Sequence, residues 1–211
     1  MLDTWKTAQV WEAEWHGNCI NSYGEEEKQL IYAEKMGLIR TPDNKTPYRF
    51  DLQGKSILDI GGGAYSLLLK CVNHKDSMVT DPLMFEYPKW VTERYKEAGI
   101  NYTSLAGEEI LEAKEDNIND DLKIDFDEVW IYNVLEHTYD PKKIIENALE
   151  LSKVVRIFEW LNTPPSEGHP QTLKEKELNE WLGGEGKTEV IKRGRANGLG
   201  YYGVFKGRHY E

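Results

Sequence analysis

Apolar positions along the chain follow two different spacings, which predict an alternation of strands and helices. Short apolar runs with β-branched residues are typical of strands that are covered on both faces. Runs with apolar residues three or four positions apart are typical of helices packed against a sheet. The predicted strands lie at 57–60, 77–82, 101–105, 126–132, 154–160, 188–193 and 201–206. The predicted helices between them lie at 67–72, 86–98 and 140–149, with a surface helix and loop at 112–125 and one more helix ending near residue 182.

This alternation predicts an α/β fold with a doubly wound, mostly parallel sheet. The last two predicted strands are separated by only about seven residues, so they must pair antiparallel. We therefore expect a Rossmann-like sheet of seven strands whose last strand is antiparallel to its neighbours.

The first 37 residues have a helical pattern and predict two helices that precede the sheet. Between them, Trp15–Tyr23 mixes aromatic and hydrogen-bonding side chains and is predicted to be a loop. This loop either docks the helices on the domain or also serves as a lid over a site. A turn-rich connector at 41–47 follows. We expect two parts, a helical extension or lid at 1–45 and a ligand-binding domain at 46–211.

The charge balance argues against one class of partner. The net charge is −11, whereas a protein that binds duplex nucleic acid usually presents a basic face. Basic residues do gather near the end of the chain. They are expected at solvated edges of strands, but they would also allow binding of an anionic acceptor or a contact within a homo-oligomer. These residues are Lys187, Lys192, Arg193, Arg195, Lys206 and Arg208.

The cysteines and the apolar runs restrict the fold further. The chain has two cysteines, Cys19 and Cys71, and no CxxC or Cys/His spacing typical of a zinc site, so no metal is predicted. Cys71 follows the glycines among apolar residues and is expected to be a small core residue. No signal peptide and no apolar run of about 18 residues is found, so we expect a cytoplasmic protein without a membrane span.

Three consecutive glycines follow the first predicted strand. Gly61, Gly62 and Gly63 can take backbone angles closed to other residues and carry no Cβ that would hold a ligand away. A strand, a glycine turn and the start of a helix together offer backbone N–H groups to an anionic group. The stretch predicts a cofactor site but does not by itself separate one cofactor from another, because dinucleotide enzymes also have such a turn.

Polar residues follow the other predicted strands. Asp81 ends the second strand, 18 residues beyond Gly63, which suits hydrogen bonding to the hydroxyls of a ribose. Glu108 follows the third strand and Asn133 the fourth. The fifth strand is followed by Glu159, Asn162 and His169. Ligands of doubly wound sheets bind at the carboxyl ends of the strands, so these side chains are predicted to share one site.

Three of these segments resemble a known family. Ile57-Leu58-Asp59-Ile60-Gly61-Gly62-Gly63 resembles motif I of the class I S-adenosylmethionine (SAM)-dependent methyltransferases, and Val79-Thr80-Asp81 is similar to their second motif. Phe126–His137, with a helix that opens at Asp140-Pro141, resembles the segment after strand four in the small-molecule subgroup. The resemblance covers about residues 54–161. Residues 1–45 are outside the common fold, and the usual glycine turn before strand five is absent.

The resemblance implies that SAM is the cofactor and gives the glycine turn its role. Gly61–Gly63 would hold the aminocarboxylate tail of SAM. Asp59 would order the loop or meet the amino group. Asp81, followed by Pro82, would bind the ribose hydroxyls.

The same resemblance assigns the adenine and the reacting methyl group. Glu108, or a backbone group near it, would meet the adenine. Asn133 and Val134 would lie beneath the methionine portion and the methyl group that is transferred. The substrate of this reaction would be a small molecule or a glycan, methylated at oxygen.

Three histidines are candidates for the base that a hydroxyl acceptor requires, because histidine titrates near neutral pH. A general base contributes about 10²–10⁴-fold to the rate. His137 follows strand four and His169 follows strand five, so both are predicted at the correct edge of the sheet. His137 is alternatively a helix-start residue that contacts the cofactor or the backbone. His16 in the predicted lid is the third candidate.

Two other functions stay open at this point. One is a nucleotide-dependent oxidoreductase with a Rossmann-like domain, since its cofactor also uses a glycine turn. The other is a non-catalytic protein that binds SAM for regulation or assembly.

Overall fold

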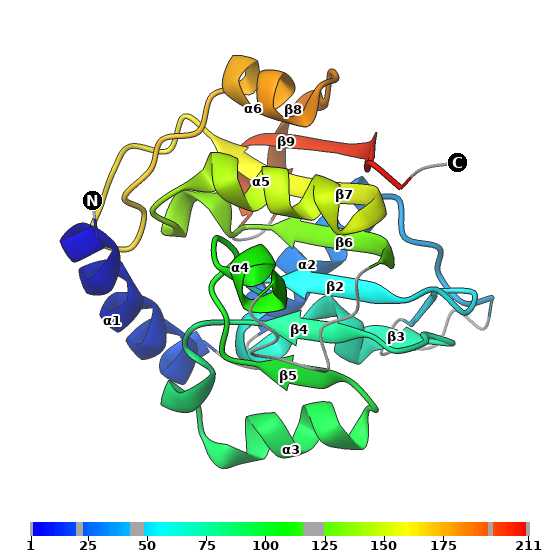
Figure 1. Cartoon of the computed structure of the whole chain (residues 1–211). Coiled ribbons are helices and arrows are strands. Elements are labelled where there is room, and N and C mark those ends of the chain that lie inside the picture. Colours follow the sequence, from blue (N-terminus) through cyan, green and yellow to red (C-terminus); the bar gives the residue numbers. More distant parts are fainter. Residues whose placement is uncertain (1, 20–22, 43–48, 116–124, 194–195, 210–211) are drawn as a thin grey trace.

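The computed structural model describes residues 2–19, 23–42, 49–115, 125–193 and 196–209 of the 211. Seven of its strands form one sheet, in the spatial order β5, β4, β2, β6, β7, β9 and β8 (Figure 1). Their bounds in that order are Asn101–Thr103, Met78–Thr80, Ile57–Ile60, Phe126–Tyr132, Ser152–Leu161, Ala196–Lys206 and Lys187–Arg193. A separate parallel pair is formed by β1 (Phe50–Asp51) and β3 (Cys71–Val72).

The predicted topology is confirmed. The strands β5, β4, β2, β6 and β7 are parallel, and β9 is antiparallel to both β7 and β8. The register places Ile60 of β2 beside Thr80 of β4 and Ile131 of β6. The carboxyl ends of these three strands therefore lie together at one edge of the sheet.

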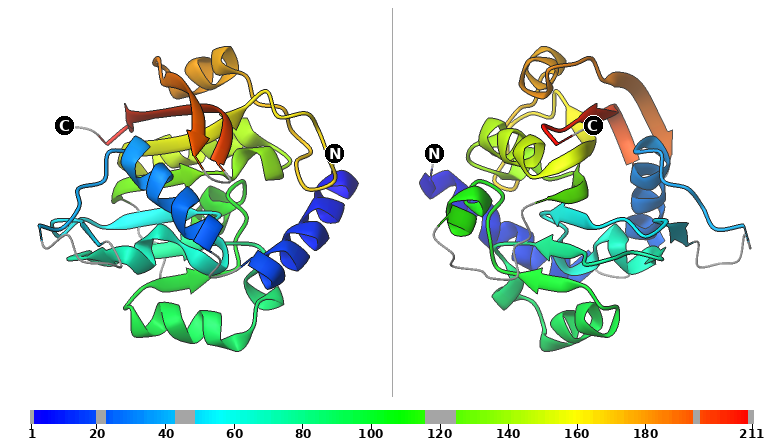
Figure 2. Two further views of the ribbon diagram at one scale, coloured as in Figure 1. Left: turned by 180° about the vertical axis from the view of Figure 1, so that it is seen from behind. Right: turned by 45° about the vertical axis from the view of Figure 1, so that its right-hand side comes forward.

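Helices cover both faces of the sheet (Figures 1 and 2). One apolar cluster includes residues of α2 and α3 and the Trp130 side of β6. The other includes residues of α4, α5 and α6 and the Val129 side of β6. The helices are α1 (Leu2–Cys19), α2 (Tyr23–Lys35), α3 (Lys89–Glu97), α4 (Ile110–Glu115), α5 (Pro141–Glu150) and α6 (Glu175–Leu182). Within the described part of the chain, no helix combines the length and the apolar character that a membrane span requires.

Helix α5 shows why the sequence pattern was informative. The Asp140 side chain accepts a hydrogen bond from Lys143 N, and Pro141 occupies the first turn, as expected for a helix start. Ile144, Ile145 and Ala148 are buried against the sheet. The helical spacing of apolar residues thus predicted both the element and its buried face.

Two predicted elements were wrong. The segment after the glycines is not an α-helix but two short 3₁₀ turns, Gly63–Tyr65 and Leu67–Lys70, followed by β3. Cys71 is buried as expected, but it lies in this strand. The predicted loop Trp15–Tyr23 is also wrong, because α1 continues through Cys19 and α2 begins at Tyr23. Residues 20–22 and the connector at 43–48 lie outside the described residues.

Some of the C-terminal basic residues lie on the edge strand of the sheet, and Arg208 lies beyond the end of β9. Strand β8 is the outermost strand, and Lys187 and Lys192 are exposed on it. Arg208 pairs with Glu150 at the end of α5. The chain boundary predicted near residue 45 stays a prediction, although Tyr32 and Met36 of the segment before it are part of the core.

A buried ion pair joins the sheet to the end of α2. Glu128 of β6 accepts hydrogen bonds from Arg156 Nε at 2.6 Å and Arg156 Nη2 at 3.0 Å, and from Lys55 Nζ at 2.7 Å. Arg156 Nη1 also donates to Met36 O at 2.7 Å. Although burial favours the neutral carboxyl, these cations lower the pKa of Glu128 to about 2. The pair therefore fixes the helix against the strands.

We predict that Glu128→Gln lowers the free energy of unfolding by about 2–4 kcal/mol, because it leaves Arg156 without its charged partner. The folded-state pKa of Glu128 is about 2, below its ordinary value of 4.5. Its contribution is therefore complete above about pH 4.5 and is lost as the pH falls toward 2. Urea denaturation of wild type and variant at several pH values measures this difference.

Glu189→Gln is the matched control, because Glu189 forms an ion pair with Lys35 at the surface. We expect no measurable change for this variant, since exposed pairs contribute little. Equal effects of Glu128→Gln and Glu189→Gln, or a difference between wild type and Glu128→Gln that does not shrink in acid, would contradict the assignment.

Candidate functional site

The glycine turn after β2 requires glycine at all three positions. Gly61 and Gly63 have positive φ angles of 69° and 61°, a region that other residues rarely adopt. A Cβ on Gly61 would lie 2.7 Å from the Val134 side chain, and one on Gly62 would lie 2.7 Å from Asp59 Oδ2. The turn is therefore packed tightly from two sides.

Asp59 holds this turn from beneath. It is fully buried, and its Oδ2 accepts hydrogen bonds from Ser66 Oγ and, at 2.6 Å, from Tyr132 OH. Burial raises the pKa of Asp59 to about 7. Tyr132 OH in turn accepts a hydrogen bond from Leu67 N at 2.9 Å. Of the two roles expected for Asp59, its position supports ordering the loop.

A second tyrosine joins the same network from helix α3. Tyr95 OH donates to Gly63 O at 2.8 Å and accepts from Ser66 N at 2.9 Å. Tyr102 OH of β5 also donates to Gly63 O, at 3.2 Å. Three tyrosine hydroxyls and one carboxylate therefore fix the turn where the sequence predicted a helix.

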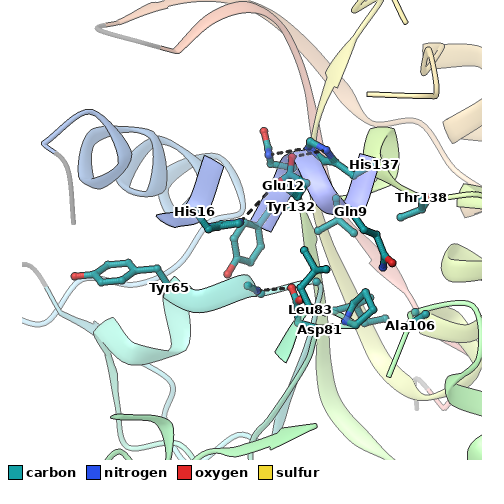
Figure 3. Close-up of a pocket in the computed structure, with 18 of the residues that line it drawn as sticks. Gln9, Glu12, His16, Tyr65, Asp81, Leu83, Ala106, Tyr132, His137 and Thr138 are labelled. Atoms are coloured by element: carbon teal, nitrogen blue, oxygen red, sulfur yellow. Dashed lines mark hydrogen bonds and ion pairs between the residues drawn. The ribbon is translucent and has the colours of Figure 1, made fainter. Parts of the chain in front are cut away.

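A cavity opens above the turn, at the carboxyl ends of β2, β4 and β6 (Figure 3). Residues that follow these strands form its base, and residues of α1 and α2 form the opposite wall. Eight of the nine residues predicted to bind the cofactor line it, namely Gly61, Gly62, Gly63, Asp81, Pro82, Glu108, Asn133 and Val134.

Asp81 is the most constrained acid of this cavity. Its Oδ2 accepts a hydrogen bond from Gly63 N at 2.9 Å, and its Oδ1 accepts one from Leu83 N at 2.8 Å. Tyr87 OH lies 3.4 Å from the same Oδ1. Burial raises the pKa of Asp81, while these hydrogen bonds and the nearby His16 favour its charged form. The acid is thus held at a fixed position beside the glycine turn.

Glu108 and Asn133 also line the cavity, and each is held by hydrogen bonds. Glu108 Oε1 accepts hydrogen bonds from Tyr139 N at 3.2 Å and Asp140 N at 3.3 Å, and burial raises its pKa. Asn133 has a positive φ of 56°, and its Oδ1 accepts a hydrogen bond from Tyr32 OH at 3.1 Å. The side chain of Asn133 is therefore held by helix α2.

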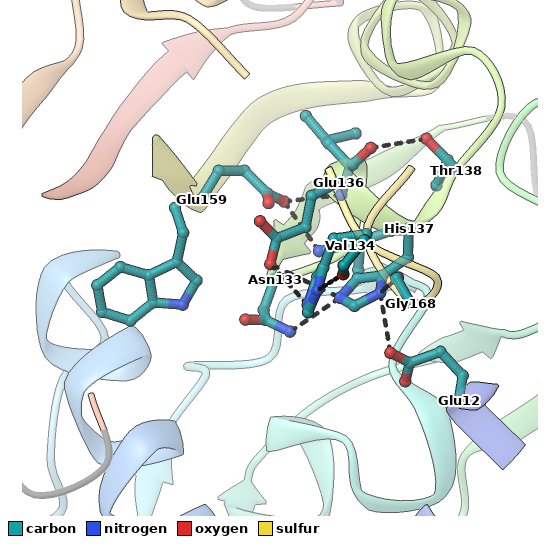
Figure 4. A network of polar contacts seen from close by, with 12 residues as sticks. Glu12, Asn133, Val134, Glu136, His137, Thr138, Glu159 and Gly168 are labelled. Atoms are coloured by element: carbon teal, nitrogen blue, oxygen red, sulfur yellow. Dashed lines mark hydrogen bonds and ion pairs between the residues drawn. The ribbon is translucent and has the colours of Figure 1, made fainter. Parts of the chain in front are cut away.

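Glu159 supports the segment after β6 from below (Figure 4). Its Oε1 accepts hydrogen bonds from Val134 N at 3.1 Å and Leu135 N at 3.3 Å. Glu159 is fully buried, and burial raises its pKa to about 8. It is therefore a structural support for the site and not part of the cavity lining. Asn162, the next polar residue along, is exposed and bonds to Lys174.

Helix α1 brings charged groups to the other wall. Trp5, Gln9, Glu12 and His16 recur every three or four residues and therefore share one face of the helix. Glu12 Oε1 lies 2.8 Å from His137 Nδ1, and Glu12 Oε2 lies 3.5 Å from His16 Nε2. His16 in turn lies over Gly63. The N-terminal helix thus contacts both the glycine turn and the segment after β6.

The candidate histidines differ in position and charge. His137 lines the cavity, whereas His169 packs behind it, with ring centroids 4.5 Å apart. Burial lowers the pKa of His137, but Glu12 and Glu136 outweigh it and raise the pKa to about 9. Burial and the charge of His137 lower the pKa of His169 to about 4. Within the described part of the chain, His137 is thus the candidate that lies beside Asn133 and Val134.

Sequence reasoning missed the residues that α1 and α2 contribute. Glu12, Gln9 and Tyr32 line the cavity but follow no strand of the sheet. The signal was the polar and aromatic face of α1. It was obscured because we expected the helix to end at Trp15.

We predict that Glu159→Leu lowers the free energy of unfolding by about 2–4 kcal/mol, because two buried N–H groups lose their acceptor. Glu159→Gln is the matched control. It keeps an oxygen at this place, and the pKa of about 8 means that Glu159 itself is neutral at pH 7. Urea denaturation at pH 7 should therefore leave Glu159→Gln close to wild type. Equal losses in the two variants would show that hydrogen bonding to Val134 and Leu135 is not the cause.

Comparisons with known proteins show which solved structures share this fold. A scan of family models and a search of curated proteins each found no match. A search of solved structures found many, among them the plantazolicin methyltransferase BamL bound to S-adenosylhomocysteine (SAH), with a TM-score of 0.56 and 11% identity. The match covers 97% of this chain and 97% of BamL.

Two further structures match over most of their length. The N-methyltransferase NodS from Bradyrhizobium japonicum WM9, also bound to SAH, has a TM-score of 0.56 and 14% identity, covering 90% of this chain and 91% of NodS. A SAM-dependent methyltransferase from Aquifex aeolicus has a TM-score of 0.55 and 17% identity, covering 92% of this chain and 98% of that protein.

Other matches extend beyond this chain or differ in reaction. The chain spans 50% of the CurJ carbon methyltransferase, with a TM-score of 0.54 and 16% identity. It spans 57% of the [4+2]-cyclase SpnF, with a TM-score of 0.52 and 13% identity. At these identities the similarity establishes the fold, and the reaction has to be argued from the site. The chain has the fold of the class I SAM-dependent methyltransferases.

Proposed function

We propose that this protein is a SAM-dependent methyltransferase that transfers the methyl group to the oxygen of a small-molecule or glycan acceptor. The observation that carries the proposal is that the glycine turn, Asp81 and the segment Asn133–Val134 all line the same cavity. These are the three places where the fold's cofactor would contact the protein. SAM would therefore be the cofactor.

The contacts follow from the chemistry of each part of SAM. The ribose hydroxyls are donors that suit the Asp81 carboxylate, and the adenine side of the cavity carries Glu108. The aminocarboxylate would lie on Gly61–Gly63. The sulfonium and its methyl group would then face Asn133 and Val134.

The charges of the cavity favour SAM over a dinucleotide. Its lining carries four carboxylate residues, Glu12, Glu25, Asp81 and Glu108, against one lysine, Lys28, and two histidines. A sulfonium cation is attracted by such a lining, whereas a pyrophosphate is repelled.

The backbone of the turn supports the same choice. The turn leads into a 3₁₀ turn, so it lacks the α-helix N-terminus on which a dinucleotide's pyrophosphate lies.

Methyl transfer from a sulfonium is an in-line displacement, so positioning is the main task of the protein. Holding the acceptor against the S–CH₃ bond supplies roughly 7–11 kcal/mol of the barrier. The acceptor oxygen forms a bond to the methyl carbon while the C–S bond breaks and its electron pair stays on sulfur. The hydroxyl proton must leave as this happens.

Glu12 is placed to take that proton, because its carboxylate lines the cavity beside His137. His137, with its pKa raised to about 9, is already protonated at neutral pH. It instead holds the carboxylate in place, with Nδ1 2.8 Å from Glu12 Oε1, on the side where Asn133 is found. A pair of this kind favours an acceptor with an ionisable hydroxyl, which is why we propose methylation at oxygen. His169, behind His137, would act on this pair and not on the acceptor.

Two tests separate the alternatives. We predict that thermal unfolding shifts upward with SAM and with SAH, and that NAD and NADP cause no shift. A ligand present at 100 times its Kd stabilises a folded protein by about 2.7 kcal/mol. A shift with NAD or NADP alone would support an oxidoreductase. SAM binding without release of SAH in the presence of any acceptor of a small-molecule and glycan library would support a non-catalytic protein.

We predict that Asp81→Ala weakens SAH binding on the order of 100-fold, because each hydrogen bond to a charged group contributes about 1.5–3 kcal/mol. Isothermal titration calorimetry measures this change. Asp51→Ala is the matched control, since Asp51 also orders a loop by accepting hydrogen bonds from Gln53 N and Asn73 Nδ2 but does not line the cavity.

Circular dichroism melting shows whether each variant is folded at the titration temperature. A folded Asp81→Ala protein with the affinity of wild type would refute the role of Asp81. If that variant does not fold, Asp81→Asn keeps one hydrogen-bonding oxygen and is expected to fold with SAH affinity between those of wild type and Asp81→Ala.

A further inference from the structure

Three side chains beside the cavity converge on one point. Glu136, His137 and His169 each offer one ligand atom, and these three atoms lie within 4.8 Å of one another. Glu136 Oε1 is 3.8 Å from His137 Nε2 and 3.4 Å from His169 Nε2. Zinc binds histidine nitrogen and carboxylate oxygen at about 2.0–2.2 Å, so two ligands at a tetrahedral angle lie about 3.4 Å apart. The three atoms are therefore spaced as metal ligands are.

The rings are already oriented as metal ligands require. His137 Nδ1 lies 2.6 Å from Gly168 O, and a carbonyl oxygen can only accept, so Nδ1 carries the hydrogen (Figure 4). Glu12 approaches the same nitrogen at 2.8 Å. A histidine that ligates a metal almost always donates its other N–H to a carbonyl or carboxylate in this way.

His169 is oriented in the same way, by a partner on its Nδ1. Its Nδ1 lies 3.1 Å from Ser166 Oγ, so that its Nε2 is the nitrogen directed at Glu136. Both rings thus present Nε2 to one carboxylate oxygen, and both have a partner on Nδ1.

Glu136 is a buried carboxyl group with few partners for its two oxygens. It is 3% exposed, and both of its ion pairs are with histidines. Among the described residues its other oxygen, Oε2, has no hydrogen-bond partner. Burying a carboxylate is costly unless a cation or hydrogen bonds compensate it. A divalent cation at the point of convergence would supply that compensation.

We propose that Glu136, His137 and His169 bind a divalent first-row transition-metal ion such as Zn²⁺ or Co²⁺. Two imidazoles and one carboxylate form a donor set that suits these ions, whereas Mg²⁺ and Ca²⁺ prefer oxygen ligands throughout. The site borders the cavity through His137 and Asn133, which both line it, and Asn133 Nδ2 lies 3.5 Å from His137 Nε2.

The ligands come from two separate loops, one after β6 and one after β7, which explains why the spacing of residues in the sequence predicted no metal site. Glu136 and His137 are adjacent, and their carboxylate and ring meet His169 only in the fold. The proposed metal site does not depend on SAM binding, because the ligands hold the ion without any cofactor contact.

Metal titration of the full chain tests this inference in the absence of SAM. After removal of metal by a chelator, we expect the wild type to bind one Co²⁺ per chain with visible d–d absorption, and Zn²⁺ to displace it. Glu136→Gln and His169→Ala should each lower the affinity at least about tenfold, as the loss of a ligand or of its support does. His209→Ala, at an exposed histidine, is the control and should bind as the wild type does.

A measurement on the wild type alone covers the case in which a variant fails to fold. Of the five histidines in the chain, only His137 and His169 should show a shifted Nε2 resonance when one equivalent of Zn²⁺ is added. No binding, an affinity that both ligand variants leave unchanged, or shifts at other histidines would each overturn the proposal. Titration with SAH in the absence of metal tests the cofactor site separately, so the two proposals can fail independently.

Discussion

The buried carboxylate of Asp59 is the constraint on which the site depends. In the described part of the chain two 3₁₀ turns, and not an α-helix, come directly after the glycines, so regular α-helical hydrogen bonds do not fix the turn. Asp59 instead accepts hydrogen bonds from Ser66 and Tyr132, and Tyr95 joins the backbone on both sides of Ala64. Buried polar networks of this kind rigidify a structure when nearly every member is satisfied. The turn can thus keep two residues at positive φ and remain a fixed surface for a ligand.

The second feature of the site is the helix that closes it. Helix α1 presents Glu12 and His16 to the cavity, and these residues contact His137 after β6 and the space over Gly63 after β2. In the proposed function the sheet therefore supplies the cofactor contacts, whereas the N-terminal helix supplies the charge beside the proposed methyl position. The same helix contacts two of the three proposed metal ligands, His137 through Glu12 and His169 through Trp11, so the acceptor side of the cavity depends on the N-terminal helix.

The sheet could be predicted from the sequence because each strand carries its own apolar pattern and each glycine or acid follows a strand. The mostly parallel sheet and the convergence of Gly61–Gly63, Asp81 and Asn133 follow from that rule, and the short connection between the last two strands predicted the antiparallel one. The 3₁₀ turns after Gly63 could not be predicted, because Leu67 and its neighbours have helical spacing. The hydrogen bonds that hold this segment involve Tyr95 and Tyr132, which come from distant parts of the chain. Glu12 could not be placed either, because tertiary packing and not local pattern positions α1.

A crystal structure of the protein with SAH bound tests the central claim most directly. It should show the ribose hydroxyls on Asp81, the aminocarboxylate on Gly61–Gly63 and the sulfur facing Asn133, with Glu12 and His137 on the far side of the position that the methyl group would occupy. SAH bound outside this cavity, or bound in it with no contact between its ribose and Asp81, would contradict the account.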